Sequence, residues 1–242
     1  MPVKLSRILI MRGTIINAVL VAVGALLGWW IGQFLPDRLG DIVMSGLGLV
    51  TVGLGIKMFL QGKNLMIIAG AIAFGGIIGT LCGFDYGFAT FVEWVKAHVG
   101  GSGSGFTTTM LTTSLLYCVG PMTILGCLQD GLEGKYQTLA LKGLLDGVGA
   151  IFFAASGDPL GVLCTAAVVF VVQGTLTLMA RPLRWLADDT EMIDEITGTG
   201  GLLLLAIGLG LLKIKDIPVV NLLPALILAP LFVAIGRKRK KA

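Results

Sequence analysis

Long apolar runs separated by short polar breaks dominate this chain. The runs lie near residues 13–34, 42–60, 64–82, 106–129, 137–156, 160–180, 196–212 and 219–236. Most are close to the roughly 20 residues that a helix needs to cross a bilayer. The breaks carry helix-ending residues such as Pro36 and the Gly157-Asp158-Pro159 sequence. The pattern therefore predicts an all-α polytopic membrane protein with eight transmembrane helices.

The composition agrees with this interpretation. Of 242 residues, 55% are hydrophobic and only 13% are charged, with a mean hydropathy of +0.93, whereas soluble domains carry about 25% charged residues. The apolar runs leave no room for a soluble domain. The net charge of +4 comes from basic residues that flank the runs, so it indicates membrane topology and no nucleic-acid partner.

The distribution of Lys and Arg predicts the orientation. In the eight-span arrangement, 14 basic residues fall on the side that holds both termini and 4 on the other side. Cytoplasmic loops carry the excess of basic residues, so we expect both termini in the cytoplasm and an uncleaved first span. The larger group comprises Lys4, Arg7, Arg12, Lys57, Lys63, Lys135, Lys142, Arg181, Arg184 and residues 237–241; the smaller comprises Arg38, Lys96, Lys213 and Lys215.

Three polar segments are interpreted as connections. Residues 84–98 interleave aromatic and charged residues, which suits a short helix in the headgroup layer or simply an aromatic belt. Residues 181–195 are expected to form a cytoplasmic connector. Gln129-Asp130-Gly131 is expected to be a cytoplasmic turn, and the lone His98 a solvated surface residue.

The two ends of the chain resemble each other. Residues 64–79 (NLMIIAGAIAFGGIIG) match residues 221–236 (NLLPALILAPLFVAIG), Gly53 and Gly55 match Gly208 and Gly210, and Gly46 matches Gly201. We interpret residues 13–82 and 160–236 as two copies of a three-helix unit, with central helices at 106–156 and a basic tail at 237–242. Because five spans precede the second copy, the copies would have opposite orientations, as in many transporters. A duplication that only built a stable bundle is the alternative.

The span at 137–156 contains the most unusual residues for a membrane interior. Lys142 and Asp146 are four residues apart and share a helical face. A charged residue at the bilayer centre costs roughly 2.5–3.5 kcal/mol on insertion scales. The pair either fixes helix packing or forms a proton or cation site, with nearby glycines letting neighbouring backbone approach the acid.

The span at 106–129 supplies a second candidate site. Thr109, Thr112 and Thr113 share a helical face, and Gly120-Pro121 interrupts the span. Broken helices in membranes bind ions and polar groups through exposed backbone, so we expect the substrate to bind here. A simple proline kink, with hydroxyls bonded to their own helix, is the alternative.

Asn17 and Gln173 occupy comparable places in the two copies. They are expected either to join the helices or to line a cavity. The ladder Gly24-Gly28-Gly32 is expected to permit close helix packing. The four cysteines stand singly without metal-ligand spacing, and no phosphate-binding loop is present, so no metal, cofactor or ATP dependence is expected.

At several of these positions the chain resembles a bacterial inner-membrane family catalogued as domain of unknown function 554, the YqgA/YdfK-like proteins. The matching stretches include RGTIINA at 12–18, SLLYCVGPMTILGCLQDGL at 114–132, KGLLDGVGAIFFA at 142–154 and TGTGGLLLLAIGLGLL at 197–212. The resemblance implies a polytopic inner-membrane protein with a presumed transport role, and it supplies no substrate or catalytic residues. Pro121 stands where we expect a small residue in this family.

Four functions compete at this point. The leading hypothesis is a secondary transporter of a small polar solute coupled to protons or Na⁺, with Asp146 as the coupling carboxylate. The others are a passive channel, an intramembrane enzyme acting on lipid, and a membrane scaffold. An enzyme is not expected, because the acids lack the spacing that marks a metal site. The partners expected are the bilayer, a solute or ion, and further copies of the chain in a homo-oligomer.

Overall fold

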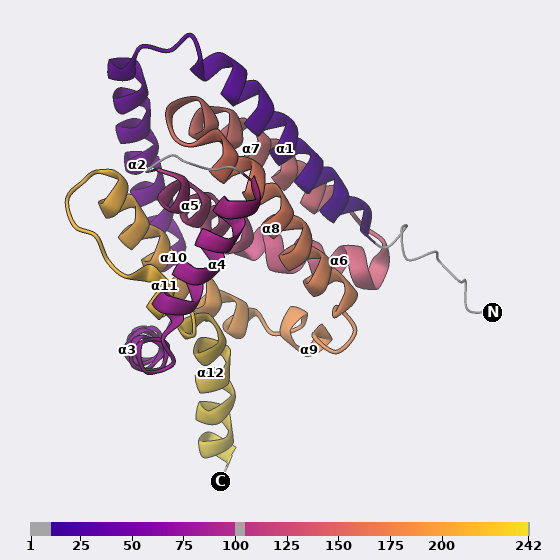
Figure 1. The fold of residues 1–242 in the computed structure, drawn as a ribbon. Coiled ribbons are helices and arrows are strands. Elements are labelled where there is room, and N and C mark those ends of the chain that lie inside the picture. Colours follow the sequence, from indigo (N-terminus) through magenta and orange to yellow (C-terminus); the bar gives the residue numbers. More distant parts are fainter. Residues whose placement is uncertain (1–10, 100–104, 242) are drawn as a thin grey trace. The chain divides into compact units, whose positions relative to one another are not determined.

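The computed structural model describes residues 11–99 and 105–241, and every regular element in these ranges is an α-helix (Figure 1). By internal contacts the chain divides into two compact units. The first unit comprises Met1–Met44 and Ser102–Asp188, and the second comprises Ser45–Gly101 and Asp189–Ala242. Each unit therefore combines early and late parts of the chain. The basic residues Lys4 and Arg7, used in the orientation argument, lie outside the described residues.

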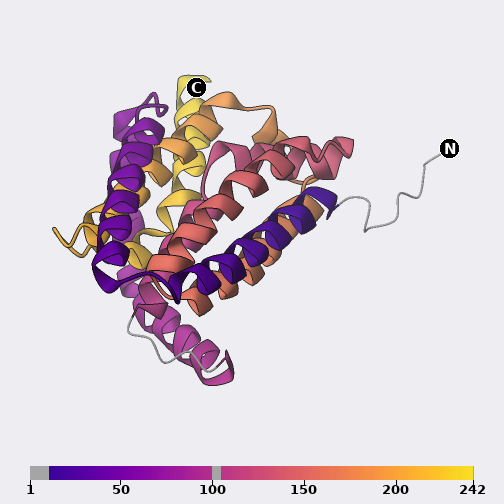
Figure 2. The same cartoon turned by 90° about the horizontal axis from the view of Figure 1, so that it is seen from above.

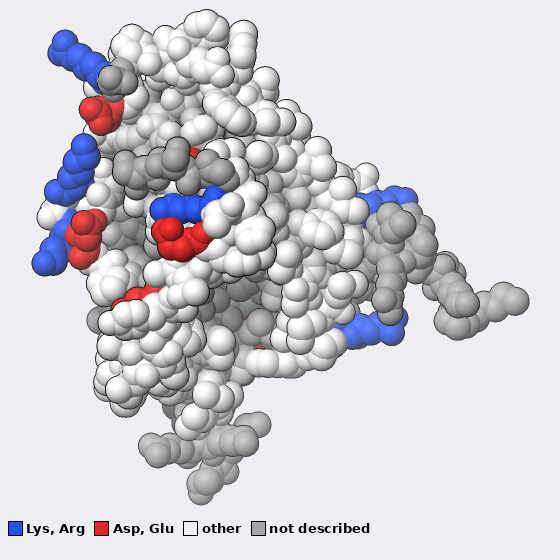
Figure 3. Space-filling view, viewed as in Figure 1, with Lys and Arg blue, Asp and Glu red and all other residues white. Residues whose placement is uncertain are grey.

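Among the described residues, six helical segments are long and apolar enough to cross a membrane. Two further helix pairs meet that test only together, and both are sharply bent: α3–α4 by 63° and α5–α6 by 57°. Eight spans are reached when each bent pair counts as one span. On the face drawn in Figure 3, charged side chains gather in a few places and most of the surface is uncharged. The chain is a membrane protein.

The first unit is built on three packed helices, α1 (Arg12–Gly32), α7 (Gln137–Ser156) and α8 (Pro159–Leu178), which lie side by side in Figures 1 and 2. The predicted glycine ladder brings α1 against α7. A Cβ at Gly24 would collide with the carbonyl oxygen of Gly147, and one at Gly28 with that of Ile151. The two helices run in the same direction, whereas α8 runs in the opposite direction, because Thr14 near the start of α1 meets Thr177 near the end of α8.

The predicted interruption of the fourth span is present. Helix α5 (Phe106–Cys118) ends before Gly120, and α6 (Pro121–Glu133) begins after it. Gly120 has φ 154° and ψ 159°, a conformation that a residue with a Cβ rarely adopts. Proline is favoured in the first turn of the new helix because it has no N–H to leave unpaired. The short helix α9 (Arg184–Ala187) completes this unit.

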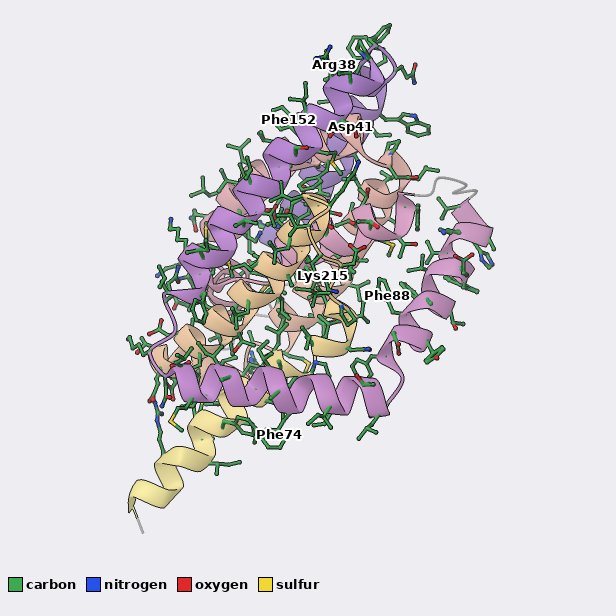
Figure 4. The ribbon with its side chains drawn as sticks, turned by 90° about the vertical axis from the view of Figure 1, so that its left-hand side faces the viewer. Arg38, Asp41, Phe74, Phe88, Phe152 and Lys215 are labelled. Carbon is green, nitrogen blue, oxygen red and sulfur yellow. The ribbon has the colours of Figure 1, made fainter. Side chains whose placement is uncertain are left out.

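The second unit is centred on α10 (Thr190–Leu211), the most buried of the candidate spans. It packs in the opposite direction against the part of α2 (Asp37–Phe59) that belongs to this unit, with Gly201 against the backbone of Gly55. Helix α3 (Leu65–Leu81) packs against α11 (Val219–Leu222) and α12 (Ala225–Lys241), and α4 (Phe84–Val99) follows it. Phe74 projects from the outward face of α3 (Figure 4).

Two predicted connections are wrong. Gln129-Asp130-Gly131 is not a turn, because α6 continues to Glu133 and ends only at Gly134, which adopts the left-handed conformation. Residues 181–195 are only partly a connector, because α10 starts at Thr190 with Asp189 as its N-cap. Acidic residues are favourable in the first turn of a helix, so the run of acids that resembled a loop is a helix start.

Candidate functional site

The predicted Lys142–Asp146 pair is formed inside the first unit. The Lys142 ammonium lies 2.8 and 2.7 Å from the two oxygens of the Asp146 carboxylate, one helical turn apart on α7. Each residue is only 7% exposed. Two opposite charges at this distance compensate each other's loss of water, and hydrogen bonds in which both groups are charged are the strongest kind.

Helices α1 and α8 each add an amide to this pair. The Asn17 side chain donates from Nδ2 to Asp146 Oδ2 and to Gln173 Oε1, each over 3.2 Å. Both amides are fully buried. Sequence reasoning identified Asn17 and Gln173 separately from Asp146 and Lys142, and the structure joins all four residues in one network.

The carboxylate fixes the direction of the hydrogen bonds in this network. An ionised Asp146 only accepts, so Asn17 must turn its NH₂ group toward it. That NH₂ group then meets the oxygen of Gln173. The Asn17 oxygen and the Gln173 nitrogen remain buried without a hydrogen-bond partner among the described residues, and an unpaired buried polar atom costs about 1–3 kcal/mol.

Glycines on α7 allow α1 to approach it closely. A Cβ at Gly143 would lie 2.7 Å from the Asn17 Cα, and one at Gly147 would lie 2.9 Å from the Leu20 carbonyl oxygen. Both distances are shorter than real Cβ contacts. The expectation that small residues bring neighbouring backbone close to the acid is therefore confirmed for Gly143 and Gly147.

Tyr117, which sequence reasoning missed, completes the surroundings of Lys142. Its ring centre lies 6.0 Å from the Lys142 ammonium, at the outer limit of a cation–π contact. The residue is 1% exposed, and its hydroxyl has no hydrogen-bond partner among the described residues. Tyr117 stands directly before the break in the fourth span, which was the one signal in the sequence that could have marked it.

The threonines form a separate cluster between α5 and α8. Thr113 donates to the Thr109 carbonyl oxygen over 2.8 Å, and its hydroxyl lies 2.7 Å from that of Thr165. Thr109 accepts from the Asp158 N–H over 3.3 Å, and Thr112 is buried nearby on the same helix. The bond from Thr113 to the Thr109 carbonyl lies within one helix, as the alternative of a simple proline kink predicted for this span.

The break itself lies close to Tyr117. After Gly120 the chain turns into α6, and the Thr123 hydroxyl donates to the Tyr117 carbonyl oxygen over 3.1 Å. This bond satisfies one carbonyl that the interrupted helix leaves free. The Pro121 side chain lies outside the described part of the structure.

Asp130 is a buried acid that sequence reasoning assigned to a turn. It is fully buried on α6 and accepts from the Gly13 N–H at the start of α1 over 2.9 Å. The first N–H groups of a helix have no partner within that helix. Asp130 therefore caps α1 from a distant part of the chain.

Glu195 is a buried acid of the second unit that holds the two residues just before α3. Its buried carboxylate accepts from the N–H groups of Lys63 and Asn64, over 3.0 and 2.8 Å, at the start of α3. The Lys63 ammonium meets the neighbouring Asp194 at 2.6 Å, and this hydrogen bond raises the pKa of Lys63. Arg237 of α12 contacts both Asp189 and Glu191, with 2.9 Å to an Asp189 oxygen.

Metal coordination is not apparent in the described part of the chain. No group of three or more His, Cys, Asp and Glu side chains in residues 11–99 and 105–241 is arranged to hold a metal ion. The four cysteines are free thiols.

Comparison with known proteins places the chain among uncharacterised membrane proteins. Residues 12–234 match a family described as "Protein of unknown function (DUF554)". The chain is 32% identical over 229 residues to the uncharacterized membrane protein YdfK of Bacillus subtilis, covering 93% of this chain and 96% of that protein. It is 33% identical over 228 residues to the uncharacterized protein YqgA of Escherichia coli, covering 90% and 94% respectively. No solved structure matches.

Proposed function

The chain belongs to the DUF554 family, and from this premise we propose that it is a secondary transporter of a small polar solute, coupled to protons or Na⁺. The observation that carries the proposal is the Lys142–Asp146 pair, which is buried in a membrane-spanning helix and bonded to Asn17. Ionisable residues inside membrane spans are expensive and are typical of ion and substrate pathways.

In this proposal Asp146 is the coupling carboxylate and Lys142 is its exchangeable partner. A proton on Asp146, or a Na⁺ ion beside it, would replace the charge compensation that Lys142 supplies. The ammonium would then be free to shift toward the Tyr117 ring or a bound solute. The Asp146 side chain is 8% exposed, so transport requires a second arrangement in which water reaches this carboxylate.

The polar groups of the fourth span are proposed to contact the solute. Helix α5 carries Thr109, Thr112 and Thr113, and the break at Gly120-Pro121 separates it from α6. The bend of 57° between those helices supports a discontinuous span, a feature common at the substrate sites of transporters. The Tyr117 ring, whose centre lies 6.0 Å from the Lys142 ammonium, links this region to the ion pair.

Packing within each unit supports the proposed inverted repeat. In an inverted repeat, a twofold axis in the membrane plane relates each helix to its copy, and the two helices run in opposite directions. Where such a helix packs against its own copy, residues at equivalent positions meet at the crossing point. In the first unit Asn17 and Gln173, which occupy comparable places in the two sequence copies, bond to each other across antiparallel helices.

A similar contact joins α2 and α10 in the second unit. The sequence match pairs Gly53 with Gly208. A Cβ at Gly208 would meet Val52, the neighbour of Gly53, at 2.6 Å. Gly208 therefore packs against the residue next to its matched glycine, whereas Gly53 itself faces open space.

The α3–α12 pair gives a third example. The match of residues 64–79 with 221–236 pairs Ile72 with Ala229, and both belong to one packed cluster. In the same match, Gly75 is equivalent to Phe232 and Ile68 is equivalent to Ala225. Gly75 packs on Ala225, and Phe232 packs on Gly70, within two residues of Ile68. Contacts that nearly repeat when equivalent residues are exchanged favour a duplication with inverted sense.

We further propose a bacterial inner-membrane location with both termini in the cytoplasm. Two ion pairs join three helix ends in the second unit. Lys63–Asp194 joins the start of α3 to the start of α10, and Arg237–Asp189 joins the end of α12 to the start of α10. The predicted topology puts these three helix ends on the cytoplasmic side, so their meeting supports it. Reactivity of single cysteines toward an impermeant reagent in intact cells would test the orientation.

The coupling role is tested by charge movement in proteoliposomes after a jump in H⁺ or Na⁺ concentration alone. We expect a transient displacement current with the natural chain and none with Asp146→Asn. A matched control is Asp130→Asn, because Asp130 is also a buried acid of the first unit but lies outside the ion pair; it should keep the transient. Unchanged transients in folded Asp146→Asn protein would overturn the coupling role, and a sustained, non-saturating current would indicate a channel.

A further inference from the structure

A cavity of about 270 Å³ lies between α6 and α9 of the first unit, two helices that are adjacent in Figure 1. Helix α6 provides most of its wall, and the α9 segment closes it. Its volume is just below the roughly 300–1,000 Å³ of drug-sized ligand pockets. The lining residues are Leu125, Leu128, Gln129, Leu132, Glu133, Arg184 and Asp188.

The cavity has an apolar wall and a charged rim. The three leucines follow one another at three- and four-residue spacing on one face of α6, while Glu133 stands at the end of that helix. Trp185, next to Arg184, is 52% exposed. Exposed tryptophan and arginine beside the end of a membrane helix are typical of the headgroup layer. The cavity therefore opens where lipid headgroups meet water.

The rim carries both signs of charge. Arg184 provides a guanidinium, whereas Glu133 and Asp188 provide carboxylates. Their present partners are weakly held: Arg184 lies 3.8 Å from Asp188, and Glu133 contacts Lys135, with all four side chains more than half exposed. Exposed ion pairs of this kind contribute little to stability, so a ligand that offers better geometry can displace them.

The chemistry that matches this rim is a phosphate joined to a primary ammonium. Arg184 binds phosphate through paired N–H groups, and the carboxylates of Glu133 and Asp188 accept hydrogen bonds from an ammonium. An anionic headgroup would leave both carboxylates unpaired. A choline headgroup has a cation but no N–H to donate.

We infer that this cavity binds the headgroup of an aminophospholipid of the phosphatidylethanolamine type, with the leucines against the upper part of an acyl chain. Arg184 holds the phosphate, and Glu133 and Asp188 hold the ammonium. The site is separate from the Lys142–Asp146 pair and does not depend on the transport proposal.

Native mass spectrometry of the full chain in detergent tests this inference. Phosphatidylethanolamine, phosphatidylcholine and phosphatidylglycerol with identical acyl chains are offered at equal concentration. Because charge-assisted hydrogen bonds are worth about 1.5–3 kcal/mol, we expect phosphatidylethanolamine adducts to exceed phosphatidylcholine adducts about tenfold. Arg184→Gln should reduce both, whereas Glu133→Gln should reduce only the ethanolamine preference.

Two matched controls separate the site from general surface charge. Arg181→Gln removes an exposed arginine three residues from Arg184 that does not line the cavity. Glu93→Gln removes an exposed acid that pairs with a nearby lysine, as Glu133 does. Both variants should keep the full preference, and thermal melts establish that all four proteins are folded.

Three results would overturn the inference: equal binding of the ethanolamine and choline lipids, a preference for phosphatidylglycerol, or an ethanolamine preference that Glu133→Gln leaves intact. Displacement of the lipid by soluble glycerophosphoethanolamine at similar concentration would also overturn it. That result would show that the acyl chain contributes nothing and that the site recognises a soluble solute.

Discussion

Replacing Lys142 by methionine removes the positive charge from the buried pair but keeps most of the side-chain volume. Asp146 then remains 7% exposed, with only the Asn17 amide donating to it. Breaking a buried ion pair by removing one partner costs about 3–5 kcal/mol. We expect the lower end of that range, about 3 kcal/mol, because the Asn17 bond is retained and the unfolded state must also hold the acid in the membrane.

The double variant Lys142→Met/Asp146→Leu makes this prediction specific. It removes both charges, so no buried carboxylate is left without a cation. We expect it to recover about 2 kcal/mol relative to Lys142→Met alone, because replacing both members of a buried ion pair by apolar residues is often neutral or stabilising. The Asn17–Gln173 bond remains available in both variants.

The assay is equilibrium unfolding in mixed micelles of denaturing and mild detergent, followed by circular dichroism of the helices. Lys135→Met is the control, since it breaks the exposed pair with Glu133 and should change the free energy of unfolding by less than about 0.5 kcal/mol. The reasoning fails if Lys142→Met costs no more than this control. It also fails if the double variant is as unstable as the single one.

Three further predictions concern the second unit. Gly55→Ala should cost about 1–3 kcal/mol in the same unfolding assay, because its Cβ would lie 2.7 Å from a backbone nitrogen of α10. Gly53→Ala is the control, because Gly53 faces open space on the same helix, and it should not destabilise the protein. Equal effects of the two variants would contradict the packing of α2 on α10. Glu195→Ala should cost about 1–3 kcal/mol, because it leaves the N–H groups of Lys63 and Asn64 just before α3 unpaired. Glu195→Gln keeps an acceptor and should cost less. A larger loss of stability in Glu195→Gln than in Glu195→Ala would refute this role of Glu195. The hydrogen bond from Arg237 lowers the pKa of Asp189, so its stabilising effect is present above the ordinary value of 3.8 and is lost as the pH falls through the lower folded value. An acid titration of unfolding should therefore lose this component in Arg237→Gln, and an unchanged acid limb would argue against the contact.

Much of the helical architecture could be predicted from apolar periodicity, but its interruptions were harder to place. The end of α7 and the start of α8 follow from Gly157-Asp158-Pro159, and the break before α6 follows from Gly120. The start of α10 was missed because its acids resemble a hydrated loop. Those acids are compatible with a helix because the first turn favours negative charge.

The candidate site was predictable in parts. Lys142 and Asp146 share a face because four residues make about one helical turn, and this depends on local sequence alone. Asn17 and Gln173 stood out as amides within apolar spans, but their contact with the pair depends on residues 129 and 156 positions apart. Tyr117 gave too weak a signal, since an aromatic residue in a membrane helix is ordinary.

The sequence by itself determined that the chain is a helical membrane protein, roughly where most of its helices lie, and which acid and base share a turn of α7. These properties follow from hydrophobicity and helical period, which act between residues close in the chain. Only the tertiary structure decided that Asp130 caps α1 and that Glu195 holds the residues just before α3. It also decided that Asn17 reaches Asp146 and that Gln173 joins the network through Asn17. A buried polar group is tolerated only where partners meet it, and here those partners come from residues more than a hundred positions away.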